Sequence, residues 1–84
     1  MNMVKVKYRA KLAALTGMAE ENFEAADVKG LLKMLKARHG SEAEKEARSM
    51  LITLNGESIL LLKQFRTALN DGDMLSFFPL CAGG

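Results

Sequence analysis

The start of the chain alternates between apolar and basic residues. From residue 4 to residue 11 the two sets of side chains are Val4, Val6, Tyr8 and Ala10 against Lys5, Lys7, Arg9 and Lys11. Side chains of a strand point alternately to its two faces, so this period of two predicts a half-buried strand. We expect its basic row to face either water or a partner.

The segment 27–40 has the period of a helix. Its apolar positions are spaced i, i+3, i+4 and i+7 and form one stripe, made of Val28, Leu31, Leu32 and Leu35. Asp27 is a favourable N-cap, and Gly40 is typical of the position just past a helix C-terminus. His39 lies at the helix end, where the helix dipole favours a cation. Gly30 is a weak point that costs about 1 kcal/mol relative to Ala.

Shorter segments continue the series of elements. Residues 11–17 predict a short helix or a turn that ends at Gly17. Residues 20–27 are polar around Phe23, and we interpret them as a second strand that pairs with the first. Ser41 and Glu44 have the spacing of a capping box, which predicts a short polar helix or an ordered loop.

Two turn signals place the remaining strands. In "LITLNGESILL" the pair Asn55-Gly56 separates two apolar runs, the pattern of a tight hairpin. Asp71-Gly72 predicts a second turn, followed by a last strand "MLSFFP". In this strand one face carries Leu75 and Phe77, and the other carries Met74, Ser76 and Phe78.

The order strand, strand, helix, strand, strand, strand predicts an α+β fold. Hairpins on both sides of one strong helix indicate a mixed sheet packed on that helix. The chain has 84 residues, the length of one small domain, so we expect residues 1–84 to form a single domain.

Composition narrows the classes of function. The formal net charge is +2, and the few aromatic residues do not interleave with basic ones, so no nucleic-acid partner is expected. The longest aliphatic run, Ile59–Leu62, is far shorter than the roughly 20 residues of a membrane span, so no membrane partner is expected. One cysteine cannot form an internal disulfide, which favours a cytoplasmic location. One His and one Cys cannot make a metal site within this chain.

Three stretches resemble the small subunit of molybdopterin synthase, a family of ubiquitin-like sulfur carriers. They are "MVKVKYRAKLAALTG", "LNGE" and, most specifically, "DGDMLSFFPLCAGG" with Gly83-Gly84 at the C-terminus. The resemblance covers most of the chain and implies a β-grasp fold. The chain departs from the family pattern at three places: Leu80 replaces a second proline, Cys81 replaces a common valine, and Arg9 replaces a common aromatic residue.

The resemblance also implies a chemistry for the tail. A C-terminal carboxyl has a pKa near 3.5 and is an anion at neutral pH, so it does not accept sulfur unassisted. In the family an ATP-dependent activating enzyme adenylates the terminal glycine, here Gly84, and sulfur from a donor such as a cysteine desulfurase replaces AMP. The resulting thiocarboxylate passes its sulfur to a pterin precursor in the large subunit, on the way to a molybdenum or tungsten cofactor. The carrier itself is not an enzyme and binds no cofactor.

The tail is expected to be slim and long enough to reach into a partner. We expect residues 80–84 to form a flexible tail that includes Cys81, Ala82, Gly83 and the reactive Gly84. From Pro79 to Gly84 the chain spans at most about 17–18 Å. Glycine lacks Cβ and suits a narrow tunnel. No sequence motif pairs Cys81 with a general base that could activate its thiol. We therefore interpret Cys81 as a small tail residue and not as a nucleophile.

The residues expected to contact a partner surround the root of this tail. Alternation places Phe78 on the outer face with Ser76, and Leu51 and Thr53 extend that face. Pro79, Leu80 and Arg9 complete the predicted partner-binding set. Other possibilities stay open: a sulfur carrier for thiamine or for tRNA thiolation, a ubiquitin-like protein modifier, or a passive interaction module.

Overall fold

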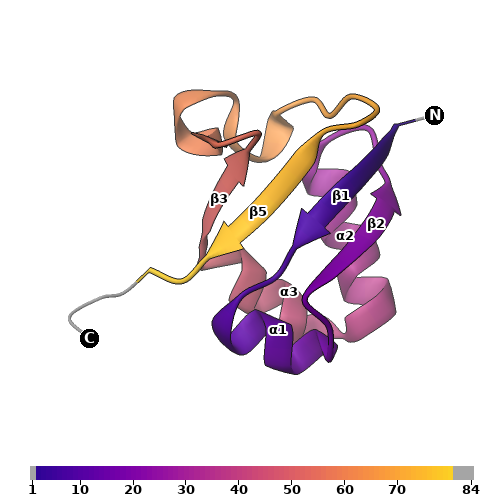
Figure 1. Ribbon diagram of the computed structural model, residues 1–84, viewed down its shortest axis with the longest axis vertical. Coiled ribbons are helices and arrows are strands. Elements are labelled where there is room, and N and C mark those ends of the chain that lie inside the picture. The colour runs from indigo at the N-terminus through magenta and orange to yellow at the C-terminus, as the bar shows by residue number, and fades with distance from the viewer. Residues whose placement is uncertain (1, 81–84) are drawn as a thin grey trace.

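The computed structural model describes residues 2–80, in which five strands form one sheet (Figure 1). The order of the strands is β2-β1-β5-β3-β4. Their bounds are β1 (Met3–Lys7), β2 (Glu20–Glu24), β3 (Leu51–Leu54), β4 (Glu57–Ser58) and β5 (Met74–Phe78). β1 and β5 pair in parallel, and the other neighbours are antiparallel. The predicted mixed sheet and the pairing of the first two strands are therefore confirmed.

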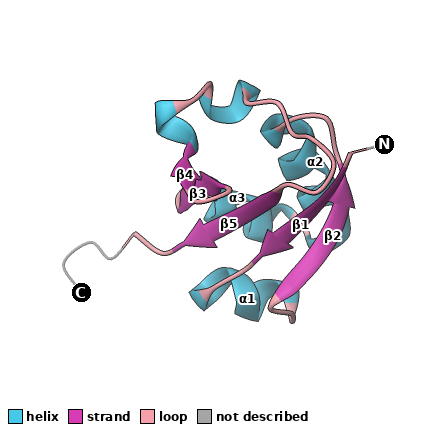
Figure 2. Cartoon of the chain, turned by 45° about the horizontal axis from the view of Figure 1, so that its top comes forward, coloured by secondary structure: helices cyan, strands magenta, loops and turns pink. Residues whose placement is uncertain are grey.

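Of the three α-helices in the described part of the chain, the second and third lie against one face of this sheet, and the first lies at the end of the sheet beside the third (Figure 2). The three helices are α1 (Ala10–Thr16), α2 (Val28–His39) and α3 (Ser41–Arg48). The predicted apolar stripe of α2 is fully buried. It packs with inward residues of the strands, among them Val4, Val6, Phe23, Leu75 and Phe77. A mixed sheet that wraps around one main helix in this way is the β-grasp fold, as expected.

The ends of α2 follow the sequence prediction. The Asp27 side chain accepts a hydrogen bond of 2.7 Å from the Gly30 backbone N–H, so Asp27 is the N-cap. At the other end the Gly40 N–H donates to the Lys36 carbonyl at 2.8 Å. Gly40 has a φ of +99°, a region that favours glycine. The helix is thus bounded by the two residues that its sequence indicates.

The helix α3 forms, but the capping box predicted at its start is wrong. Ser41 is the first helical residue and Gly40 occupies the N-cap position, with no side-chain hydrogen bond to the helix end. Glu44 instead accepts a hydrogen bond from Arg48 at 3.0 Å, one turn later. The buried residues of α3 are Ala43 and Ala47, so this helix also contributes to the core.

The hairpin at Asn55-Gly56 is confirmed, but its second strand is short. β4 contains only two residues, after which the chain forms two 3₁₀ turns, η1 (Ile59–Leu61) and η2 (Gln64–Arg66). The apolar run therefore leaves the sheet. Leu60 and Leu61 become 67% and 76% exposed.

A second turn ties the start of β5 to its neighbours. The Met3 N–H donates to the Asp71 carboxylate at 2.9 Å. Asn55 uses its side-chain amide twice, donating to Asp73 at 2.9 Å and accepting from the Met74 N–H at 2.9 Å. The two predicted turns thus hold the starts of β1 and β5 and the end of β3 together.

Candidate functional site at the end of the central strand

The central strand β5 delivers the chain to the molecular surface. It has β1 on one side and β3 on the other, and it ends at Phe78 (Figure 1). The two residues that follow, Pro79 and Leu80, are exposed, and Leu80 is 62% accessible. The predicted chemical residues Cys81, Ala82, Gly83 and Gly84 lie outside the described residues. The described part of the site is therefore the root of the tail.

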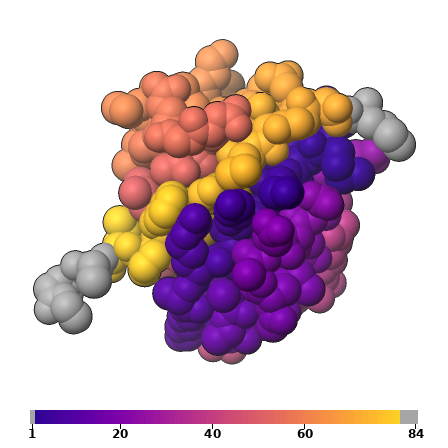
Figure 3. All heavy atoms as spheres, in the orientation of Figure 1, coloured from indigo at the N-terminus to yellow at the C-terminus, as the bar shows by residue number. Residues whose placement is uncertain are grey.

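Alternation along β5 is as predicted from the sequence. Leu75 and Phe77 are fully buried on the inner face, and Phe78 is half-buried on the outer face. Ser76, also on the outer face, is 8% exposed because the central strand is flanked on both sides. The space-filling view shows β5 crossing this face between β1 and the segment that contains η1 (Figure 3). Phe78 is thus the large apolar side chain of β5 closest to the tail.

Arg9 covers Phe78. Its guanidinium carbon lies 4.1 Å from the centroid of the Phe78 ring, within the range of a cation–π contact. Arg9 is the N-cap residue of α1 and follows the end of β1, whereas Phe78 ends β5. Because β1 and β5 pair in parallel, the C-terminal ends of both strands lie at the same end of the sheet. The sequence predicts each residue to face outward, and the structure places them in contact.

Leu51 and Thr53 differ in what they offer. Leu51 pairs with Phe78 and Thr53 with Ser76 in the antiparallel ladder, so both belong to the outer face. Leu51 is half-buried and extends the apolar surface beside Phe78. Thr53 is only 9% exposed and presents little surface to a partner.

Leu80 borders a small apolar cavity of about 100 Å³. Its wall includes Leu51, Leu60 and Phe65. Sequence reasoning missed Leu60 and Phe65, because the run that contains Leu60 was interpreted as a strand. The sequence signal that could have located Leu60 is the length of this apolar run. The strand takes up only two residues, so the leucines that follow it lie at the surface.

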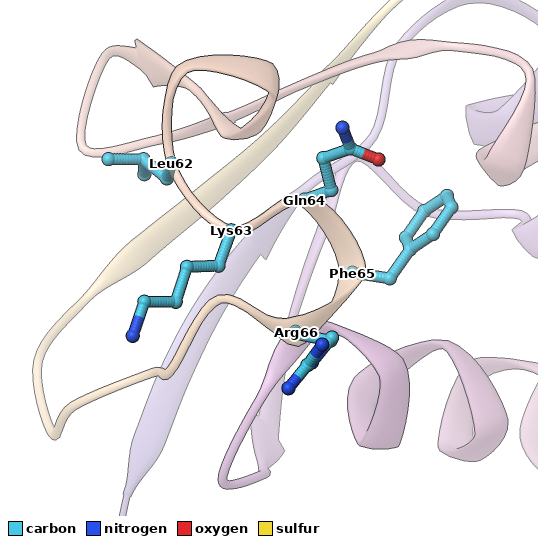
Figure 4. A pocket seen from close by; sticks show the side chains of 5 residues that line it. All are labelled: Leu62, Lys63, Gln64, Phe65 and Arg66. Carbon is cyan, nitrogen blue, oxygen red and sulfur yellow. The ribbon is translucent and has the colours of Figure 1, made fainter.

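A larger hollow of about 580 Å³ lies in the loop between β4 and β5, and it makes a poor site (Figure 4). Its lining is a single stretch of chain, residues 62–66. The close-up shows their side chains pointing away from one another, with Phe65 on the opposite side of the loop from Lys63. Converging polar groups, which a ligand site requires, are not seen among these five residues.

A polar cluster stabilises the sheet elsewhere. Glu21 Oε1 accepts from the Tyr8 hydroxyl at 2.7 Å and contacts His39 Nε2 at 2.7 Å, and Glu21 Oε2 accepts from Arg38 at 3.0 Å. Partial burial alone would raise the pKa of Glu21, but hydrogen bonds from Tyr8, His39 and Arg38 outweigh it and lower that pKa. Burial, then the contact with Glu21, raises the pKa of Tyr8. The predicted helix-end residue His39 thus joins α2 to β2.

Fold and site together define a small ubiquitin-like protein of the β-grasp type. The chain belongs to the ThiS family, whose model matches residues 6–84. It is accordingly a ThiS-type, ubiquitin-like sulfur carrier. Within residues 2–80, no helix has the length and apolar character needed to cross a membrane.

Three solved structures illustrate the similarity. A putative molybdopterin converting factor, subunit 1, from Pyrococcus furiosus is 32% identical, with 94% of this chain and 98% of that chain covered and a TM-score of 0.76. Small archaeal modifier protein 1 from Methanosarcina acetivorans is 27% identical, with 100% and 98% covered and a TM-score of 0.85. A chain of the complex of subunits 1 and 2 of the molybdopterin-converting factor from Helicobacter pylori is 26% identical, with 98% and 99% covered and a TM-score of 0.70. No match is found among curated proteins.

Proposed function

We propose that this chain is the sulfur-carrying small subunit of a molybdopterin synthase. The observation that carries the proposal is the central strand β5, which ends in an outward Phe78 and then leads through exposed Pro79 and Leu80 toward Gly83-Gly84. The Pyrococcus furiosus relative and the Helicobacter pylori complex, described as molybdopterin converting factors, support the proposal of this branch.

In this proposal Gly84 is the chemical centre. Its carboxylate attacks the α-phosphorus of ATP on an activating enzyme, releases pyrophosphate and forms an acyl-adenylate, which removes the negative charge of the carboxylate that repels nucleophiles. The terminal sulfur of a persulfide on a donor such as a cysteine desulfurase then displaces AMP to give an acyl disulfide. A second thiol attacks the donor sulfur of that disulfide, forms a new disulfide with the donor and releases the thiocarboxylate. The thiocarboxylate sulfur attacks a carbon of the pterin precursor, and water then hydrolyses the bond between the sulfur and the Gly84 carbonyl carbon, which restores the carboxylate. The sulfur-containing pterin is the precursor of a molybdenum or tungsten cofactor. The chain contributes no catalytic side chain and no bound cofactor, and it acts in the cytoplasm.

The role of the folded part is to dock and to aim the tail. Phe78, Leu51 and Arg9 form the surface against which the large subunit packs, next to Leu80. Pro79 fixes its own φ and disfavours helical geometry at Phe78, so the chain leaves the sheet in an extended direction. The last residues, without bulky side chains, then enter the active site of the large subunit.

The test is a two-stage assay with wild type, Gly84→Ala and a chain extended by one residue after Gly84. The first stage measures, by intact mass, the exchange of one oxygen for sulfur after incubation with the activating enzyme, ATP and a sulfur source. The second stage measures the pterin product with the large subunit. We expect the wild type to be active and Gly84→Ala to lose on the order of a hundredfold in rate, because a displacement of about 1 Å at a reacting carbon has this effect. Full product formation by the extended chain, verified as unprocessed, contradicts the proposal.

A second candidate is a ubiquitin-like modifier, which the similarity to small archaeal modifier protein 1 favours. Both functions begin with the same adenylate at Gly84, and they differ in what attacks it. A modifier gives an amide with a lysine of another protein, whereas a carrier gives a thiocarboxylate. The same mass measurement separates the two, since only the modifier yields a covalent adduct with a target protein. A carrier for thiamine or for tRNA thiolation forms the thiocarboxylate but gives no pterin product in the second stage.

A further inference from the structure

Residues 2–80 contain three arginine–phenylalanine stacks, and in one of them the arginine has no carboxylate partner. Arg38 lies over Phe23 at 4.2 Å and Arg48 over Phe65 at 5.3 Å, measured from the guanidinium carbon to the ring centroid. Arg38 also forms an ion pair with Glu21 at 3.0 Å, and Arg48 forms one with Glu44 at 3.0 Å. In both stacks an aromatic ring supports the guanidinium and a carboxylate accepts from it.

Arg9 stacks on an aromatic ring, that of Phe78, but has no carboxylate partner among the described residues. It lies over Phe78 at 4.1 Å, the shortest of the three distances. Among the described residues it forms no ion pair, and its buried Nη1 finds no hydrogen-bond acceptor. A buried donor without an acceptor is unfavourable, and native structures almost always satisfy such groups. The missing acceptor therefore points to a group outside residues 2–80.

The charge around Arg9 specifies the kind of acceptor. Lys5 and Lys7 precede it along the same face of β1, opposite Met74 and Ser76 of β5. These neighbours on β5 are uncharged, whereas on the β2 side Lys5 lies opposite Asn22 and Lys7 opposite Glu20, so no carboxylate of either ladder is paired with Arg9. A basic row beside a stacked guanidinium attracts a negatively charged group, and a planar carboxylate matches the two parallel N–H donors of arginine.

We propose that Arg9 is a specificity-determining residue that accepts an aspartate or glutamate of the partner protein into the open position beside Phe78. This inference rests on the proposed function, because the partner is the enzyme that docks on the Phe78 surface. Phe78 supplies the apolar contact and holds the guanidinium flat, and Arg9 selects partners that carry an acidic side chain there.

The test measures dissociation constants for the cognate large subunit and for the activating enzyme, at about 50 mM and about 300 mM salt. The variants are Arg9→Gln, which removes the charge, and Arg9→Lys, which keeps the charge but loses the planar fork. Lys33→Gln is the matched control, since it removes one positive charge from the exposed side of α2, away from the outer face of the sheet. Thermal unfolding of each variant verifies the fold.

We expect Arg9→Gln to weaken binding to at least one of the two enzymes by about 10–100-fold at low salt and to reduce its salt dependence, because a desolvated charge pair is lost. The dissociation constant of Arg9→Lys should lie between those of the wild type and Arg9→Gln. The dissociation constant of Lys33→Gln should stay within about twofold of the wild-type value, because this surface charge is away from the interface. A double-mutant cycle tests the pairing directly. Replacing the paired aspartate or glutamate of the enzyme by its amide should weaken binding to wild type but cause no further loss of affinity in the Arg9→Gln background.

Several outcomes overturn the inference. Unchanged affinity and salt dependence of folded Arg9→Gln for both enzymes shows that no partner acid binds there. Self-association of the free chain that disappears in Arg9→Gln assigns the acid to a second copy instead. The proposed function fails separately if Arg9-dependent binding occurs but no sulfur reaches the pterin. If the wild type binds neither the large subunit nor the activating enzyme, both the inference about Arg9 and the proposed function are wrong.

Discussion

The Tyr8 hydroxyl donates a 2.7 Å hydrogen bond to Glu21 Oε1, the same oxygen that His39 contacts. β1, β2 and the end of α2 therefore meet at one carboxylate. Because this carboxylate has a lowered pKa, it takes up a proton more readily in the unfolded chain than in the folded one. Its contribution to stability is present above its ordinary pKa and is lost as the pH falls through the lowered folded value.

We expect Glu21→Gln to lower the free energy of unfolding by about 1–3 kcal/mol at neutral pH, the range for a hydrogen bond to a charged group. The difference in unfolding free energy between wild type and variant should shrink as the pH falls below the ordinary glutamate pKa and then through the lowered pKa of the folded state, because the wild-type carboxylate becomes protonated there. Urea unfolding at several pH values measures this. Glu42→Gln, at an exposed position of α3, serves as control. A difference that is independent of pH would contradict the argument.

The two neighbouring phenylalanines of β5 should respond differently to truncation. Phe77 is fully buried, so Phe77→Ala should cost about 3–5 kcal/mol of stability. Phe78 is half-buried and faces outward, so Phe78→Ala should affect stability less and weaken partner binding by about 1–3 kcal/mol. Denaturant unfolding and calorimetry provide the two measurements. Should Phe78→Ala unfold the protein while partner binding per folded molecule is unchanged, the assignment of the outer face is wrong.

The starts of the two consecutive helices provide a matched pair of capping tests. Asp27→Ala removes a side chain that accepts from the Gly30 N–H, and it should destabilise the protein by about 0.5–2 kcal/mol. Ser41→Ala removes an exposed hydroxyl with no capping bond, and its effect should stay within about 0.5 kcal/mol. Thermal unfolding distinguishes the two. Equal losses would show that Ser41 does cap α3 in solution.

Gly30 and Asp27 should be energetically coupled. A Cβ at Gly30 would lie 3.1 Å from Asp27 Oδ1, tighter than ordinary contact. Gly30→Ala gains up to about 1 kcal/mol in helix propensity, but in the wild type part of this gain is lost in displacing the cap. In the Asp27→Ala background the full gain should appear. A double-mutant cycle of unfolding free energies measures the coupling, and simple additivity of the two effects would contradict it.

Much of the fold follows from local patterns in the sequence. The alternation in β1 and the stripe of α2 are strong signals because one side of each element is buried. The Asn55-Gly56 turn is equally clear, since Asn55 adopts a φ of +52° that few residues tolerate. These elements sufficed to predict an α+β domain with a mixed sheet packed on one helix, and the family resemblance implied the β-grasp fold.

Other features depend on tertiary contacts that no local pattern reveals. Ala43 and Ala47 are buried although charged residues surround them in sequence, because small side chains let α3 approach the core closely. The run Ile59–Leu61 has strand-like composition but forms η1 beyond the two-residue strand β4. For the site, each face could be predicted, but the contact between Arg9 and Phe78 depends on the parallel register of β1 and β5. Residues 81–84 stay outside the described structure, so their roles stay predictions.

The position of β5 also has a mechanical consequence. This strand is hydrogen-bonded on both sides, in parallel to β1 and antiparallel to β3, and its start is fastened through Asn55 and Asp73. A force applied to the residues beyond Phe78 is directed along the strand, so it loads both ladders in shear instead of peeling one bond at a time. An enzyme that binds the end of the chain can therefore exert tension on it without detaching β5 from the rest of the sheet.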